Sequence, residues 1–111
     1  MINKLDFFWY DEGQPGARFQ GEEAPIGWLF ENELSAGPEA CDAVLAEVNR
    51  IESGIIPFVE IQGNENVLWI GPLSAQITNH HFNPPKATTF PLGEFKGIVE
   101  QWRAFLETAP D

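Results

Sequence analysis

Residues 92–106 carry the strongest periodic pattern in the chain, Leu92-Gly93-Glu94-Phe95-Lys96-Gly97-Ile98-Val99-Glu100-Gln101-Trp102-Arg103-Ala104-Phe105-Leu106. Apolar residues recur at the three- and four-residue spacing that lines one face of an α-helix. They are Phe95, Ile98, Val99, Trp102, Phe105 and Leu106. The pattern predicts an amphipathic helix over about residues 92–108 that packs on a sheet, with Trp102 in the core.

A second stripe of this kind precedes it. Its apolar members are Cys41, Val44, Leu45, Val48 and Ile51. Pro38 suits a first helical position and Gly54 suits the left-handed residue that follows a helix. We therefore expect a helix over about residues 38–53, with Cys41 as a buried structural thiol on its apolar face.

Strand-like segments flank the helix predicted from residue 38. Aromatic or alternating apolar residues bounded by turn residues predict strands at 5–10, 17–20 and 26–30, then at 55–61, 67–70, 73–78 and 87–90. Trp69 lies in the apolar segment 67–70, where we expect it to pack in the core. Hairpin-length connections indicate an antiparallel arrangement. We predict a single α+β domain spanning residues 1–111, with one antiparallel sheet of about five to seven strands and two packed helices.

Composition limits the class of protein. With 111 residues, of which 43% are hydrophobic, the chain can bury a core of its own. Its one cysteine cannot form an internal disulfide, and its N-terminus lacks the pattern of a secretory leader. No apolar run approaches the roughly 20 residues that span a bilayer. We expect a soluble, cytoplasmic protein.

The negative charge is concentrated in the first part of the chain. Of its 17 acidic residues, 13 lie in residues 1–65 against three basic ones, whereas residues 66–111 are nearly neutral. Such a field speeds encounter with a cationic surface and repels nucleic acid and anionic membrane. We therefore expect a basic protein partner, and neither a nucleic acid nor a membrane.

Signatures of catalysis or metal binding are weak. His80 and His81 are adjacent, so on a strand they would point to opposite faces. No serine lies in a nucleophile elbow, and no phosphate-binding glycine pattern occurs. We expect no catalytic residue, no metal and no cofactor. A glycosidase-like carboxylate pair, such as Glu22 and Glu23, is the alternative that would make the chain a small enzyme.

Tryptophans beside acidic turns provide the candidate contact residues. Trp side chains anchor many protein interfaces, while carboxylates meet the Arg and Lys of a partner. The residues predicted to contact the partner are Asp11, Glu12, Glu22, Glu23, Glu31, Glu33, Trp9 and Trp28. Core packing of the two tryptophans and a merely solvated acidic surface are the alternatives.

The acidic α+β profile, together with residues 91–106, resembles the small immunity proteins of bacterial contact-dependent inhibition and polymorphic-toxin systems. The resemblance implies a cytoplasmic protein that binds and neutralises a cognate basic toxin domain, often a nuclease. These proteins share no universal motif, so the resemblance assigns no role to any residue. Three alternatives remain: an adaptor that binds a basic protein without inhibiting it, a small enzyme, and an anionic mimic of DNA.

Overall fold

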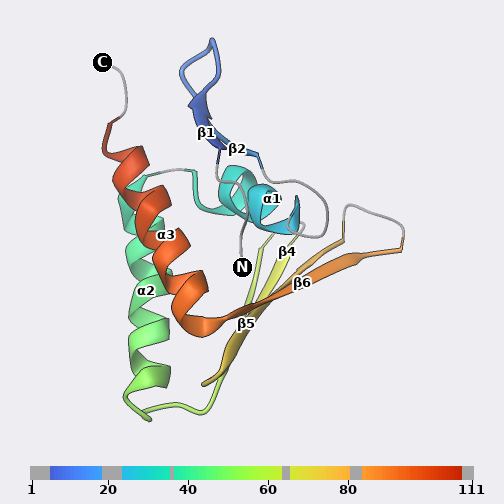
Figure 1. Cartoon of the computed structure of the whole chain (residues 1–111), viewed down its shortest axis with the longest axis vertical. Coiled ribbons are helices and arrows are strands. Elements are labelled where there is room, and N and C mark those ends of the chain that lie inside the picture. Colours follow the sequence, from blue (N-terminus) through green and yellow to red (C-terminus); the bar gives the residue numbers. More distant parts are fainter. Residues whose placement is uncertain (1–5, 19–23, 36, 64–65, 81–83, 109–111) are drawn as a thin grey trace.

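A computed structural model describes residues 6–18, 24–35, 37–63, 66–80 and 84–108 (Figure 1). Its elements, in chain order, are β1 (Asp6–Trp9), β2 (Pro15–Arg18), α1 (Ala24–Glu33), α2 (Pro38–Glu52), β3 (Val59–Gln62), β4 (Asn66–Ile70), β5 (Ser74–Asn79), β6 (Lys86–Pro91) and α3 (Leu92–Leu106). The α+β class is confirmed, and α2 and α3 lie where their apolar stripes predict them. No helix among the described residues is long and apolar enough to cross a membrane.

The strands form two antiparallel sheets, which corrects the expectation of one sheet. Among the described strands, β1 pairs with β2 alone, as a separate hairpin, while β3-β4-β5-β6 form a four-stranded sheet in sequence order. In the larger sheet, alternate residues face the helices: Leu68 lies opposite Ile77, and both are buried. The hairpin stands apart from this sheet, above α1 (Figure 1). Sequence patterns indicate which neighbouring strands form a hairpin. They do not indicate whether two hairpins join into one sheet, so the split into two sheets was not predicted.

The core lies between this sheet and the three helices. Trp102 of α3 is fully buried, and its indole Nε1 donates a hydrogen bond to the carbonyl oxygen of Leu34 at 2.9 Å. Its ring stacks on Phe30 with a centroid distance of 5.1 Å. Trp69, expected in the core, instead lies half-buried on the opposite face of the sheet, beside the exposed Phe58. Strand alternation explains this, since its neighbours Leu68 and Ile70 face the helices.

α1 replaces the strand predicted at residues 26–30. Ile26, Leu29 and Phe30 follow helical spacing and are all buried. A short, continuous apolar run does not distinguish a buried strand from a buried helix, because both are covered on all sides. This ambiguity explains both the additional helix α1 and the absence of the strand predicted at residues 26–30.

The β1-β2 hairpin is fixed to the core at its base. Phe7 contacts the rings of Phe30 and Trp102, at centroid distances of 6.3 and 5.2 Å. At the other end, the Tyr10 amide donates to the carbonyl of Gln14 at 2.7 Å, and Gly13 adopts a left-handed φ of 88°. The turn is thus closed by its own backbone and the base is held by aromatic packing.

Candidate partner-binding site

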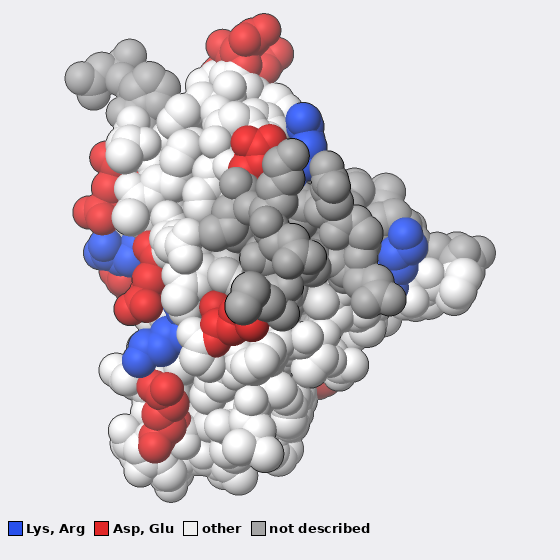
Figure 2. Space-filling view, in the orientation of Figure 1, with Lys and Arg blue, Asp and Glu red and all other residues white. Residues whose placement is uncertain are grey.

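The tip of the β1-β2 hairpin carries two of the predicted contact residues. Asp11 and Glu12 are exposed and have no ion pair or hydrogen bond with any residue that the structure describes. Figure 2 shows acidic atoms at this outer end of the hairpin. The tip therefore presents negative charge that a partner can reach from several directions.

Glu31, the third predicted residue, fastens the hairpin to α1. One carboxylate oxygen accepts a hydrogen bond from the Tyr10 hydroxyl at 2.9 Å, and the other accepts one from the Ala17 amide at 3.0 Å. The bond to this carboxylate raises the pKa of the Tyr10 hydroxyl, because ionisation of the phenol would break it. Glu31 thus has a structural role, on the wall of a recess of about 350 Å³ that Gln14, Pro15 and Ser35 complete.

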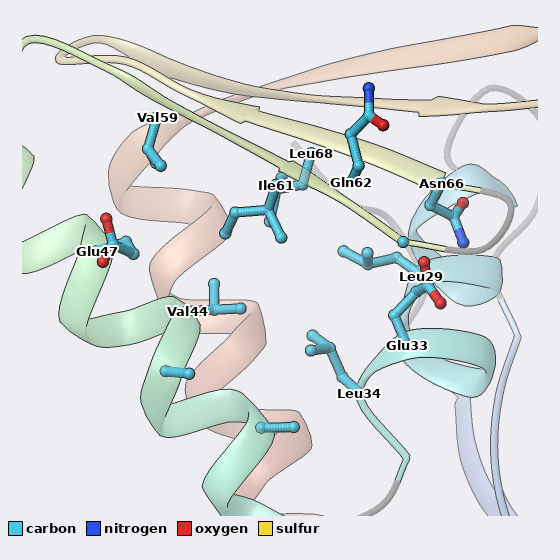
Figure 3. Close-up of a pocket in the computed structure, with 13 residues that line it drawn as sticks. Leu29, Glu33, Leu34, Val44, Glu47, Val59, Ile61, Gln62, Asn66 and Leu68 are labelled. Atoms are coloured by element: carbon cyan, nitrogen blue, oxygen red, sulfur yellow. The ribbon is translucent and has the colours of Figure 1, made fainter.

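Glu33 lies in a different place, at one end of a groove of about 550 Å³ between α2 and β3. Most of the groove wall is apolar (Figure 3). The lining residues are Leu29, Glu33, Leu34, Ala40, Ala43, Val44, Glu47, Val59, Ile61, Gln62, Gly63, Asn66 and Leu68. Glu47 lies at the far end from Glu33 and Asn66 (Figure 3). The Glu47 carboxylate pairs with Arg50 at 3.1 Å, whereas one oxygen of Glu33 has no partner among the described residues. The groove therefore combines an apolar floor with an incompletely paired carboxylate at the Glu33 end, which suits a ligand that is both apolar and basic.

Two buried polar atoms in this groove have no hydrogen-bond partner among the described residues: the Oε2 atom of Glu33 and the Nδ2 atom of Asn66. Asn66 is only 1% exposed, and its side-chain oxygen Oδ1 accepts a hydrogen bond from Asn79 Nδ2 at 2.8 Å. An unpaired buried polar group costs about 1–3 kcal/mol. Such groups in a groove are the kind that a ligand would satisfy.

Of the remaining predicted residues, only Trp9 has a side chain that the structure describes. Trp9 is half-buried and stacks on Phe105 of α3, with ring centroids 4.8 Å apart, so it serves mainly to hold the hairpin. Trp28 belongs to α1, but its side chain is outside the described part of the structure, as are Glu22 and Glu23. The described acidic residues of the predicted set are divided among the hairpin tip, the contact between the hairpin and α1, and the groove.

On the two long helices, several acidic side chains are paired with basic ones. Arg103 donates hydrogen bonds to Asp42 at 2.6 Å and to Glu107 at 2.9 Å. The bond from Arg103 lowers the pKa of the Asp42 carboxyl. Lys96 pairs with Glu52 at 3.1 Å across the two helices. Figure 2 shows basic atoms interleaved with acidic ones along this side. The negative charge of the helices is therefore partly neutralised, whereas the negative charge of the hairpin tip is not.

The histidine and cysteine side chains considered for catalysis or metal binding show no constellation among the described residues. His80 is exposed, His81 lies outside the described residues, and Cys41 is fully buried. Burial, and next the charge of Asp42, raises the pKa of the Cys41 thiol to about 11. Within the described residues, no group of three or more His, Cys, Asp or Glu side chains is placed to hold a metal ion.

Sequence reasoning missed the groove and the role of Asn66. A polar residue in the core-facing phase of the strand containing Leu68 and Ile70 was the available signal, because such residues are buried only with a partner. Comparison with protein-family models, curated proteins and solved structures gave no match. The argument for function therefore rests on the geometry and charge of this chain.

Proposed function

We propose that this protein is an immunity protein, which binds a basic toxin domain and neutralises it. The observation that carries the proposal is the hairpin tip, where Asp11 and Glu12 are exposed and unpaired in a chain of net charge −11. A projecting acidic tip on a folded domain suits a concave basic surface. The active-site groove of a nuclease is such a surface, because it binds phosphates.

The way the hairpin is held supports this mechanism. Glu31 and Tyr10 join it to α1, while Phe7 and Trp9 pack it against the core. Because the hairpin is ordered before binding, association would lose less conformational entropy than ordering a flexible loop. Carboxylates placed where phosphates bind would then exclude the substrate.

The test is binding kinetics with a basic domain encoded beside this protein's gene, together with the catalytic activity of that domain. Asp11→Lys combined with Glu12→Lys should slow association by about tenfold or more, and raising the salt concentration should reduce the difference. The matched control is Glu39→Lys combined with Glu100→Lys, an equal charge change at exposed residues of α2 and α3. Its effect should be several times smaller.

Two outcomes would contradict the proposal in different ways. Equal slowing by the hairpin and control variants would show that total charge, rather than the hairpin, drives association. Tight binding that leaves the activity of the basic domain unchanged would favour an adaptor over an immunity protein.

A further inference from the structure

β3 is an edge strand whose outer side is unpaired within the described residues, where its one strand neighbour is β4. The Gly63 amide donates to the Asn66 carbonyl at 2.8 Å, and Ile61 lies opposite Leu68. Since hydrogen-bonded pairs alternate along an antiparallel ladder, the main-chain groups of Glu60 and Gln62 point away from β4. These two residues offer two N–H and two C=O groups to an added strand.

The groove lies where the inward side chains of such a strand would pack. Val59 and Ile61 of β3 line one side of it, and Ala40, Ala43 and Val44 of α2 line the other. Ala43 is exposed, and Val59 and Ile61 are only half-buried. The helix layer therefore extends beyond the sheet edge. Apolar side chains two residues apart on an added strand would fill the space between them.

The Glu33 end of the groove specifies the chemistry of the occupant. Glu33 Oε2 needs a hydrogen-bond donor, and Asn66 Nδ2 needs an acceptor. A Lys or Arg side chain is the donor that also neutralises a carboxylate in apolar surroundings, and a carbonyl oxygen supplies the acceptor. The carboxylate of Glu33 rests against Gly63, where a side chain would overlap it. The absence of a side chain at Gly63 thus provides the space in which the Glu33 carboxylate lies.

We propose that an extended segment of a basic partner adds to the sheet as a fifth strand beside β3, with apolar side chains in the groove and a Lys or Arg side chain at Glu33. The inference rests on the proposed function only in assigning this segment to the same basic partner, because the Lys or Arg side chain follows from the unpaired oxygen of Glu33. It assigns to β3, Glu33 and Asn66 a contact separate from the hairpin tip.

A second copy of this chain is a poor occupant of the same edge. Pairing β3 with its own copy would bring Glu60 of each copy to one narrow interface, with Glu33 and Glu47 nearby, in a chain of net charge −11. Like charges placed opposite each other on paired strands are destabilising. Charge complementarity therefore favours a basic segment.

The experiment selects binders from a phage-displayed library of random peptides of about nine residues, the length of a long strand. Enriched peptides should alternate apolar and polar residues and carry a Lys or Arg in the apolar phase. The best peptide is then synthesised and its affinity measured by titration calorimetry. Amide hydrogen exchange at Glu60 and Gln62 should be slower in the complex than in the free protein.

Five variants, two of which are controls, identify the contacts. Gln62→Pro removes an outward N–H without removing a bond to β4 and should abolish binding, while Gln62→Thr keeps the N–H and should bind. Glu33→Gln should weaken binding about tenfold, since it replaces a charge-assisted bond by a neutral one. Gly63→Ala should weaken it similarly by displacing the Glu33 carboxylate. Glu100→Gln, on the exposed side of α3, is the control of equal charge and should bind as the wild type does.

The inference is wrong if no peptide is enriched, or if Gln62→Pro and Glu33→Gln bind the selected peptide as tightly as the wild type. It is also wrong if the protein sediments as a dimer that Gln62→Pro dissociates, because the occupant would then be a second copy. If no peptide binds but hexylamine binds the wild type and Gln62→Pro equally well, the groove is a small-molecule pocket instead. None of these results alters the kinetics of the hairpin variants, so the two proposals fail independently.

Discussion

Trp102 provides the sharpest test of how the hairpin, the helices and the sheet are joined. Its ring contacts Phe7 of β1, Phe30 of α1 and Phe105 of its own helix, at centroid distances of 5.2, 5.1 and 5.7 Å. Replacing it by alanine removes a fully buried indole and leaves a cavity, which should cost about 3–5 kcal/mol. That is a large share of the roughly 5–15 kcal/mol by which a domain is stable.

A second substitution at this position separates packing from hydrogen bonding. Trp102→Phe keeps much of the ring packing but leaves the buried Leu34 carbonyl without its donor, so we expect a cost of about 1–3 kcal/mol. Urea unfolding at unchanged m measures both costs, with Ala104→Ser on the exposed side of α3 as the control. A Trp102→Ala protein that loses less than about 1 kcal/mol would refute the assignment of this residue to the core. Wild-type stability in Trp102→Phe would show that the bond to Leu34 contributes nothing.

Two further predictions concern the contact of Glu31 with the hairpin and the Cys41 thiol. Glu31→Ala should destabilise the protein by about 2–3 kcal/mol, because it leaves the buried Ala17 amide without an acceptor. Tyr10→Phe should cost less than about 1 kcal/mol, because it removes only the bond from the exposed hydroxyl. Equal losses of stability in urea unfolding would contradict the anchoring role of Glu31. Cys41, with a pKa of about 11, should be protonated at pH 8 and react with a disulfide reagent on the timescale of unfolding; stoichiometric reaction within seconds would show an accessible thiolate.

The elements that the sequence predicts well are those whose apolar residues have one unambiguous period. Val44, Val48 and Ile51 of α2, and Phe95, Val99 and Trp102 of α3, follow the helical repeat, and all six are buried. Charged residues such as Asp42 and Glu100 fall off these stripes, so no strand pattern competes. In α1, by contrast, the run from Ile26 to Phe30 has no polar residue to reveal a period. Leu34, four residues beyond Phe30 and also buried, was the signal for a helix that the run itself obscured.

The groove was beyond the reach of the sequence for a different reason. Ala43 and Ile61 reveal nothing special by their types, and they form a site only because α2 lies past the end of a four-stranded sheet. How many strands a sheet contains is a property of the assembly. The unpaired atoms of Glu33 and Asn66 likewise depend on contacts between elements far apart in the chain.

The helix at α1 also separates two carboxylates that were both predicted to contact the partner. In an extended chain, Glu31 and Glu33 would share one face, since side chains two apart on a strand point the same way. In a helix they are separated by about 200° around the axis, because each residue turns the chain by about 100°. Glu31 accordingly reaches the hairpin, where Tyr10 and Ala17 use its charge, while Glu33 reaches the groove with one oxygen unpaired. Two residues predicted as one contact surface are therefore an anchor and a candidate binding group, and substituting them should have different effects: loss of stability for Glu31 and loss of affinity for Glu33.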